Sequence, residues 1–214
     1  MKKIISLLIS FIPFNIIRIF LLRILCGYQI DYKSSIGMFN VIVADKFVLV
    51  NSKIGKFNYI EAKNVTIKKG IINKFNRIKH INNLGLAENS MIFSKNFIGG
   101  SKNQKNKEYQ NLILGSDSEI LRNNYFDVTS EIKIGNNVVF GGNGSEIWTH
   151  GFDLDRNILL GTVVFENDIF IGSKCIFTKG VKVVSETTIG PGSMVYKSIL
   201  ESGMYSSHQL LKVN

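Results

Sequence analysis

Residues 169–199 read IFIGSKCIFTKGVKVVSETTIGPGSMVYKSI, and this stretch decides the fold. On an α-helix, residues six apart point about 120° away from each other, so a helix would scatter an apolar set with that spacing. A coil of short straight edges, each with one inward side chain, explains a six-residue spacing. The stretch therefore predicts a parallel β-solenoid, in which strands stack at ~4.8 Å around a narrow aliphatic core. Its apolar series is Phe165, Ile171, Phe177, Val183, Ile189 and Val195.

The same period extends back through most of the chain. Glycine often follows the apolar residue, as in Ile36-Gly37 and Ile54-Gly55, which suits a tight corner that needs positive φ or close approach. We therefore expect an all-β domain over residues 31–214. The earlier series are Ile36, Ile42, Val48, Ile54 and Ile60; Ile72, Ile78 and Leu84; Leu86, Ile92 and Ile98; Leu114, Ile120, Phe126 and Ile132; and Ile134 with Phe140.

Two polar segments interrupt the period. Residues 100–111 read GSKNQKNKEYQN, and residues 149–162 read THGFDLDRNILLGT. Insertions in a solenoid become loops, commonly on the face that carries function. We expect the functional site near these two loops.

Composition narrows the class of protein. The chain has 214 residues, 45% of them hydrophobic and 20% charged, which is typical of a folded core and not of a disordered chain. Cys26 and Cys175 have no Cys or His partner at ligand spacing, so neither a metal site nor a disulfide scaffold is expected. A net charge of +10 favours anionic partners. Without a dense basic run or a nucleic-acid motif, we do not expect binding to nucleic acid.

Residues 1–30 differ from the rest and predict an apolar helical segment. A spanning helix needs about 20 largely uncharged apolar residues, and Pro13 and Arg18 interrupt the run here. No small-x-small cleavage site follows, which disfavours a signal peptide. We expect residues 1–28 to form a bent helical segment at a membrane surface, with Lys and Arg reaching toward headgroups. The alternative is a helix that only caps the main domain and is buried by a partner subunit.

From Ile36 onward the chain resembles the hexapeptide-repeat acyltransferases, which include galactoside, maltose and xenobiotic acetyltransferases. The resemblance is carried by Ile134-Gly135-Asn136-Asn137-Val138, by Thr149-His150-Gly151 and by residues 169–199. It implies a left-handed parallel β-helix, a homotrimer and acetyl-CoA as co-substrate. The leader IPFNIIRIFLLRILCGYQI and the ending ESGMYSSHQLL also resemble the branch that modifies O-antigen and capsular sugars. That branch implies acetylation of a sugar hydroxyl on a surface polysaccharide or its precursor, which can be lipid-linked, in the cytoplasm or at the inner face of the membrane.

His150 matches the position of the family's catalytic histidine. A hydroxyl is a poor nucleophile at neutral pH, and imidazole has the right unperturbed pKa to act as its general base. Asp153, Asp155 or Glu146 could orient the ring through its other nitrogen, or be solvated acids. Trp148 shares a face with His150 if the backbone is extended there. It would then stack on a sugar or line the thioester channel, and simple packing against the loop is the alternative.

The resemblance also suggests binding residues. An amide near the acceptor would be Asn123 or Asn124, although an Asn at a corner tolerates left-handed backbone without any such role. The positions matching the acetyl-CoA site are Ser173 for the pantetheine arm, Lys197 for the phosphates, and Pro191 and Tyr196, which depart from the family's usual residues. Lys179 and Lys182 could assist or be solvated.

The sequence bears on three rival functions. A γ-class carbonic anhydrase needs three metal-binding histidines, and the chain has only His80, His150 and His208, none of them in a His-x₄-His pair. A non-catalytic solenoid would present regular outward arrays of Thr or Asn, whereas Asn is irregular here. N-acetylation of a nucleotide-linked amino sugar needs the same base, and His150 does not distinguish it from O-acetylation.

Overall fold

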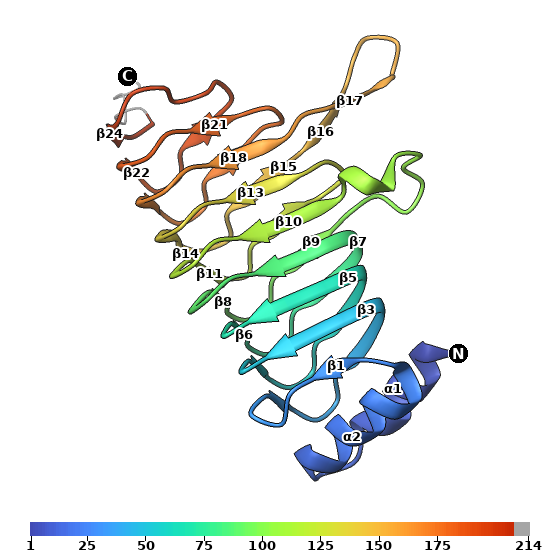
Figure 1. The fold of residues 1–214 in the computed structure, drawn as a ribbon. Coiled ribbons are helices and arrows are strands. Elements are labelled where there is room, and N and C mark those ends of the chain that lie inside the picture. The colour runs from blue at the N-terminus through green and yellow to red at the C-terminus, as the bar shows by residue number, and fades with distance from the viewer. Residues whose placement is uncertain (208–214) are drawn as a thin grey trace, which may run out of the picture.

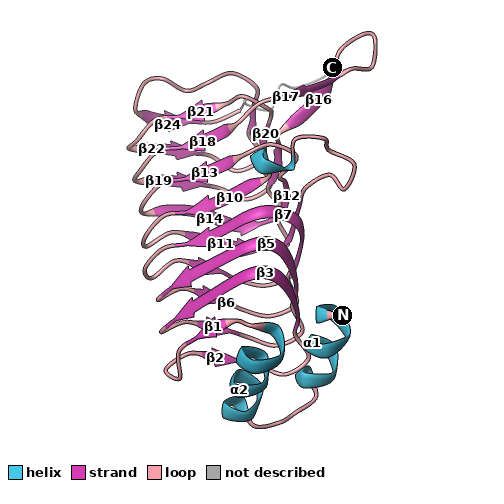
Figure 2. Ribbon diagram, turned by 45° about the vertical axis from the view of Figure 1, so that its right-hand side comes forward, coloured by secondary structure: helices cyan, strands magenta, loops and turns pink. Residues whose placement is uncertain are grey.

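The computed structural model describes residues 1–207. Two helices, α1 (Lys2–Ser10) and α2 (Asn15–Cys26), precede a tapering stack of parallel coils (Figures 1 and 2). One face of the stack is formed by β2 (Ser35–Ile36), β4 (Lys53–Ile54), β6 (Ile71–Ile72), β8 (Met91–Ile92), β11 (Glu119–Arg122), β14 (Val138–Asn143), β19 (Ile169–Ile171), β22 (Thr187–Ile189) and β24 (Gly203–Tyr205). The prediction of a mostly β solenoid with an N-terminal helical segment is confirmed.

The other two faces belong to one continuous sheet. It opens with β1 (Gln29–Ile30) and with three long strands that bend across both faces: β3 (Val41–Val50), β5 (Tyr59–Lys68) and β7 (Arg77–Leu86). Beyond them the two faces have separate strands. The second face has β9 (Phe97–Gly99), β12 (Tyr125–Asp127), β15 (Glu146–Trp148), β20 (Ile176–Phe177) and β23 (Met194–Val195); the third has β10 (Asn111–Leu114), β13 (Ile132–Ile134), β18 (Val163–Phe165) and β21 (Lys182–Val183).

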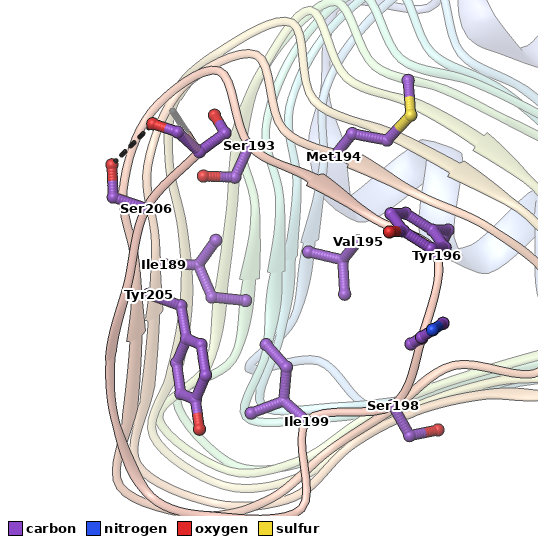
Figure 3. Close-up of a pocket in the computed structure, with 11 residues that line it drawn as sticks. Ile189, Ser193, Met194, Val195, Tyr196, Ser198, Ile199, Tyr205 and Ser206 are labelled. Atoms are coloured by element: carbon purple, nitrogen blue, oxygen red, sulfur yellow. Dashed lines mark hydrogen bonds between the residues drawn. The ribbon is translucent and has the colours of Figure 1, made fainter. Parts of the chain in front are cut away.

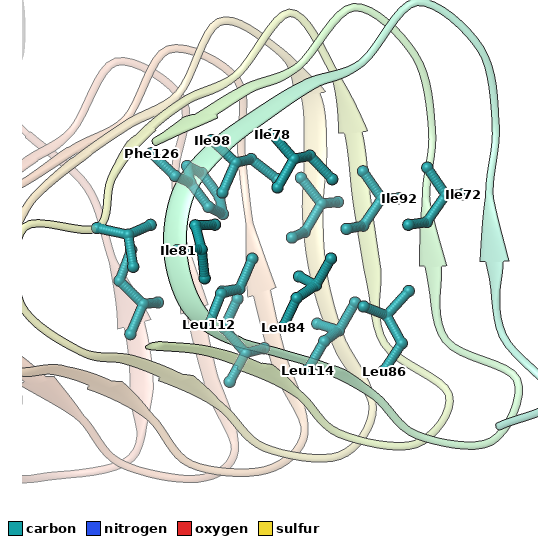
Figure 4. Packing of buried hydrophobic residues seen from close by; sticks show 14 of the residues in the cluster. Ile72, Ile78, Ile81, Leu84, Leu86, Ile92, Ile98, Leu112, Leu114 and Phe126 are labelled. Carbon is teal, nitrogen blue, oxygen red and sulfur yellow. The ribbon is translucent and has the colours of Figure 1, made fainter. Parts of the chain in front are cut away.

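The strand register explains the six-residue period. Ile36 pairs with Ile54, and Ile54 pairs with Ile72, so one coil holds three hexapeptides. Each inward side chain therefore rests on its equivalent in the next coil, as Figure 4 shows for Ile72 and Ile92 and for Ile78 and Ile98. Burial of such columns removes apolar surface from water, and this stabilises the fold by about 25 cal/mol per Å² of apolar surface buried.

One position of the predicted series is wrong. Val48 is only half-buried, and its neighbours Phe47 and Leu49 point into the core instead. The cause is the bend of β3 at Asp45 and Lys46, which are both exposed and so reset the inward–outward alternation.

Close approach, not positive φ, explains the corner glycines. A Cβ on Gly37 would lie 2.4 Å from the carbonyl oxygen of Gly55, and one on Gly55 would lie 2.7 Å from that of Asn73. Positive φ at this corner falls on Phe39 and Phe57, both at 60°. At Gly37 and Gly55 the next coil is thus too close for a side chain, whereas the equivalent position one coil later is Asn73.

A ladder of buried asparagines stabilises the corner between the first and second faces of successive coils. The backbone N–H of each member donates to the side-chain oxygen of the member one coil earlier, at 2.8–3.0 Å, and the ladder passes to Ser145 at 2.9 Å. These bonds satisfy polar groups that would be costly to bury unpaired. The members are Asn40, Asn58, Asn76, Asn96 and Asn124.

The two helices cap the first coil. Ser6 Oγ accepts a hydrogen bond from Ile42 N at 2.8 Å, and Tyr28 Oη donates to Ile42 O at 3.1 Å. Arg18, predicted to reach headgroups, is instead buried and donates through Nε to Ile36 O at 3.0 Å. These contacts satisfy backbone groups that a first coil leaves without a preceding strand.

The outward side of the helices is apolar and exposed. The chain breaks between α1 and α2 at Pro13, as the sequence predicts. Within residues 1–207, neither helix has the length and apolarity to cross a bilayer. The exposed side chains are Ile4, Leu7, Leu8, Phe11, Phe14, Ile16, Ile17, Phe20, Ile24 and Leu25.

Candidate active site

Both insertions leave the solenoid at the same corner, between its second and third faces. Residues 100–110, with a short 3₁₀ turn η1 (Lys107–Tyr109), connect β9 to β10. Residues 149–162 connect β15 to β18 and form a projecting hairpin of β16 (His150–Phe152) and β17 (Ile158–Leu160) (Figure 1). His150 begins this hairpin, where the chain departs from the coil.

His150 forms a close pair with a buried carboxylate. Its Nδ1 lies 2.7 Å from Oδ2 of Asp127, the last residue of β12. A carboxylate accepts and does not donate, so Nδ1 carries the proton and Nε2 of a neutral ring has a free lone pair. This is the arrangement that a general base requires.

Asp127 is held rigidly by its neighbours. It is 4% exposed, and Oδ2 also accepts from Thr149 N at 3.0 Å. Oδ1 accepts from Thr129 Oγ1 at 2.5 Å. Thr149 Oγ1 in turn donates to Asp127 O at 2.9 Å and accepts from Ser130 N at 2.8 Å. This network fixes the carboxylate, and therefore the ring of His150, in one orientation.

A cavity of about 320 Å³ opens beside the pair and is bordered by both insertions. Gly100 and Ser101 line it from the first loop, and His150, Phe152 and Ile158 line it from the hairpin. Its floor contains Gly99, which pairs with Asp127 in the neighbouring coil. Gly99 has no side chain, and the Phe97 ring lies about 3.0 Å from where its Cβ would be.

An aromatic row leads to His150 across three coils. The rings of Phe97 and Tyr125 stack at 4.9 Å, and Tyr125 lies 5.0 Å from Trp148. Trp148 and His150 lie with their rings 6.2 Å apart, as extended backbone predicts for that spacing. The rings face one another, so the row presents a continuous apolar surface of ring edges beside His150.

The residues expected to orient His150 lie elsewhere. Asp153 accepts from Asn157 N at 2.7 Å at the hairpin tip, and this hydrogen bonding lowers the pKa of its carboxyl. Glu146 accepts from Trp148 Nε1 at 2.9 Å, and Asp155 is exposed. Asp127 takes the expected place. Aligning the hexapeptides one coil back would have found it, since β12 pairs with β15.

Asn123 and Asn124 are also placed away from His150. Asn124 is buried, and its amide is used in the asparagine ladder. Asn123 donates to Asn143 at the opposite end of β12 from Asp127, about 13 Å along the strand. Neither amide lines the cavity at His150.

The four predicted donor-binding residues divide between two corners. Tyr196 and Lys197 follow β23 and lie in the same column of corners as the His150 hairpin. Ser173 and Pro191 lie at the corner between the first and second faces, where Ser173 Oγ accepts from Asn143 N at 3.3 Å. Lys179 lies nearer to His150, because a Cβ on Gly151 would meet its Cε at 3.2 Å.

A second cavity marks the C-terminal end of the core. Figure 3 shows Ile189, Val195 and Ile199 pointing into it, with Tyr196 and Tyr205 at its edge. It lies at the last coil of residues 1–207, several coils beyond Asp127. Its walls carry none of the His150 network.

Among residues 1–207, no group of three or more His, Cys, Asp or Glu is arranged to hold a metal ion. His80 contacts Glu61, with Nδ1 3.2 Å from Oε1. His208, the third histidine of the carbonic anhydrase alternative, lies outside the described residues.

No protein-family model and no curated protein sequence matches the chain. Among solved structures, it is similar to the polySia-specific acetyltransferase NeuO, with 17% identity and a TM-score of 0.42 over 80% of this chain and 73% of that chain. It is also similar to the UDP-N-acetylglucosamine acyltransferase of Francisella novicida, with 14% identity and a TM-score of 0.25 over 84% of this chain and 65% of that chain. The fold assignment rests on the strand register itself. That register and the hexapeptide spacing make the chain a parallel β-helix, the fold of the hexapeptide-repeat acyltransferases that its sequence resembles.

Proposed function

We propose that the chain is an acetyl-CoA-dependent O-acetyltransferase with His150 as its general base. The observation that carries this proposal is the His150–Asp127 pair, at 2.7 Å, in a cavity bordered by both insertions. Asp127 acts as a positioning residue that holds Nδ1 protonated and Nε2 free.

The reaction needs one proton carrier. Nε2 of His150 takes the proton of the acceptor hydroxyl while the oxygen attacks the thioester carbonyl carbon. The tetrahedral intermediate then collapses, the carbon–sulfur bond breaks, and the CoA sulfur leaves with the proton that the imidazolium returns. His150 ends neutral, as it began.

The donor thioester would approach from the C-terminal side of His150. The corners that follow it in the same column carry Lys179, Tyr196 and Lys197, and lysines attract CoA phosphates as point charges. Ser173 and Pro191 would contact the donor only if it reached the neighbouring corner.

The acceptor, in our proposal, is a sugar hydroxyl of a surface polysaccharide such as O-antigen or capsule, or of its precursor. The resemblance of the leader and of the chain's ending to that branch supports it, together with the aromatic row beside His150. The reaction would take place in the cytoplasm, where acetyl-CoA is available.

We propose a homotrimer in which the hairpin packs on a neighbouring subunit. The hairpin exposes Phe152 at 62%, Leu154 at 103% and Ile158 at 52%, which is unusual for a loop facing water alone. Light scattering on a gel-filtration column should give three times the monomer mass, and Leu154→Asp should lower it. A wild-type monomer that retains full activity would contradict the shared site.

We also propose that the apolar side of α1 and α2 contacts a membrane surface. Residues 1–30 contain no acidic residue, and Arg23 is exposed and can meet anionic headgroups. Flotation with phosphatidylglycerol vesicles should fall in the Phe14→Ser/Phe20→Ser double variant. It should not fall in Phe170→Ser, a matched control because Phe20 and Phe170 are 49% and 51% exposed.

The test of the enzymatic proposal is thiol release from acetyl-CoA with a panel of lipid-linked, polymeric and nucleotide-linked sugars. With the true acceptor, His150→Ala should lower kcat by roughly 10²–10⁴-fold. Product analysis distinguishes an ester from an amide, and so O-acetylation from N-acetylation. A His150→Ala variant with the full rate would overturn the proposed base.

A further inference from the structure

The cavity at His150 continues toward the N-terminal coils. A second hollow adjoins it, and Lys79 lines both. In the strand register, Tyr59 pairs with Arg77, Arg77 with Phe97, and Phe97 with Tyr125. These four outward side chains form one column that leads along the solenoid axis to the active-site cavity. We name the two hollows and this column the acceptor groove.

The acceptor groove has more cations than carboxylates: Lys3, Arg77 and Lys79 against Glu61 and Asp127. Lys79 Nζ lies 5.2 Å from the ring centroid of Phe97, and Lys3 Nζ lies 5.2 Å from that of Tyr59. In the part of the chain that the structure describes, neither Lys3, Lys79 nor Arg77 forms an ion pair. An anion that enters the groove would therefore meet cations with no carboxylate already bound.

The carboxylates of the groove are all engaged. Glu61 accepts from Tyr59 Oη at 2.5 Å and contacts His80. Asp127 accepts from His150, Thr129 and Thr149. These hydrogen bonds hold both carboxylates away from Arg77 and Lys79 without removing their charge, and the excess of cations favours a negatively charged ligand.

We propose that the acceptor is an acidic carbohydrate, whose ring lies across the outward edges of the stacked Phe97 and Tyr125 rings and whose anionic group is bound by Lys79. This inference rests on the proposed function and adds the substrate class. The anionic group is a carboxylate on the sugar or a phosphate attached to it, and both are recognised by the same cations.

The spacing of the coils allows one sugar to contact both Lys79 and His150. Lys79 pairs with Gly99, and Gly99 pairs with Asp127, so the backbone of Lys79 lies two coils, about 10 Å, from that of the residue that holds His150. The Lys79 side chain extends over the Phe97 ring of the next coil, and Gly99 contributes only backbone to the cavity between Lys79 and Asp127. A sugar ring placed there reaches the base with a hydroxyl and Lys79 with its anionic substituent. Arg77 and Lys3 lie farther along the acceptor groove, where they can bind further acidic sugar residues of a longer acceptor.

Binding can be measured without turnover, because Trp148 is the only tryptophan and lies in the aromatic row. Its fluorescence is titrated with oligosaccharides that contain uronic acid, and with the same oligosaccharides after reduction of their carboxylates to alcohols. A second pair, UDP-N-acetylglucosamine and N-acetylglucosamine, is titrated in the same way to compare a sugar with and without phosphate. The variants are Lys79→Gln, Lys79→Arg and Lys74→Gln, which removes the same charge from an exposed corner of the same coil.

We expect the wild type to bind the charged member of at least one matched pair roughly tenfold tighter than the neutral member. Lys79→Gln should lose that preference, Lys79→Arg should retain most of it, and Lys74→Gln should leave it unchanged. A preference confined to the phosphate pair would identify phosphate as the anionic group.

Equal affinity within every pair would overturn the proposal, as would equal effects of Lys79→Gln and Lys74→Gln. Failure of the enzymatic proposal has a different signature. In that case the charged sugar would still bind with its dependence on Lys79, but no thiol would be released from acetyl-CoA.

Discussion

Two histidine–carboxylate pairs adjoin the acceptor groove, and they differ in what surrounds them. His80 lies at an irregularity within the long strand β7, where it adopts a φ of 55°, and its Nδ1 is 3.2 Å from Glu61. His150 lies where the coil is interrupted, and its Nδ1 is 2.7 Å from Asp127. Glu61 is half-exposed and also binds Tyr59, whereas Asp127 is buried among Thr129 and Thr149.

The comparison teaches where this fold can build a catalytic site. In the first coils, β3, β5 and β7 run across two faces without a break, so no loop encloses His80. At His150 the coil opens, and residues of both insertions border the cavity. The interruption of the repeat therefore supplies the enclosure that a histidine–carboxylate contact alone lacks.

The largest expected effect separates the two pairs. In Asp127→Asn the new amide can donate to Nδ1, which favours the tautomer with a proton on Nε2, where it blocks the base. We expect kcat/KM to fall roughly 10²-fold, with an altered pH–rate profile and a small change in melting temperature. Glu61→Gln makes the same substitution at the other pair and should change kcat less than about threefold, because Glu61 borders the acceptor groove but does not contact His150. Equal losses would mean that Asp127 has no positioning role.

A second effect concerns Asn124, which belongs to the asparagine ladder and was also predicted to bind the acceptor. Asn124→Ala leaves Ser145 N without its acceptor, and this should lower the free energy of unfolding by about 2 kcal/mol. Asn58→Ala, in the same ladder but far from His150, should cost a similar amount. Chemical denaturation measures both.

The acceptor KM then distinguishes ladder from site. It should be unchanged in Asn124→Ala, since the amide of Asn124 is used inside the coil. A selective rise in KM for Asn124→Ala alone would restore the acceptor-binding role that the sequence predicted.

The sequence predicted the core well because each inward residue has its neighbour at a fixed distance along the chain. Ile54 and Ile72 are equivalent in successive coils, and the spacing alone reveals it. Val48 was predicted wrongly because a bend in β3 shifts the alternation of inward and outward side chains. The six-residue spacing of the sequence does not reveal such a bend.

The site was only partly predictable for the same reason. His150 stands out because it lies in an interruption flanked by repeat motifs. Asp127, its partner, comes from the preceding coil, and the contact exists only once β12 and β15 are in register. Asp153 and Glu146 were chosen because they are close in sequence, and proximity in sequence does not measure distance across stacked coils.

A smaller effect is expected when a side chain is added at Gly99, which lines the cavity at His150. A Cβ there would lie 3.0 Å from Phe97 Cε1, so Gly99→Val narrows the cavity beside Asp127 and displaces the Phe97 ring slightly. We expect the acceptor KM to rise about tenfold, with little change in hydrolysis of acetyl-CoA without acceptor. Gly85→Val, on the third face of the coil, should leave both unchanged. An unaltered KM in Gly99→Val would place the acceptor elsewhere.

The smallest effect concerns the cap and appears only at alkaline pH. Burial raises the pKa of Tyr28 to about 12, and its hydroxyl binds Ile42 O and Ala44 N. Because the folded-state pKa lies above the unfolded value of about 10, the neutral hydroxyl stabilises the fold below pH 10. That contribution is lost as the pH rises toward 12. We expect a loss of about 1 kcal/mol between pH 10 and 11, measured by denaturation against Tyr28→Phe, which lacks the titrating group. Identical alkaline profiles of the two proteins would mean that the cap does not shield this hydroxyl, and that the helices hold the first coil less tightly than the contacts of Ser6 and Arg18 indicate.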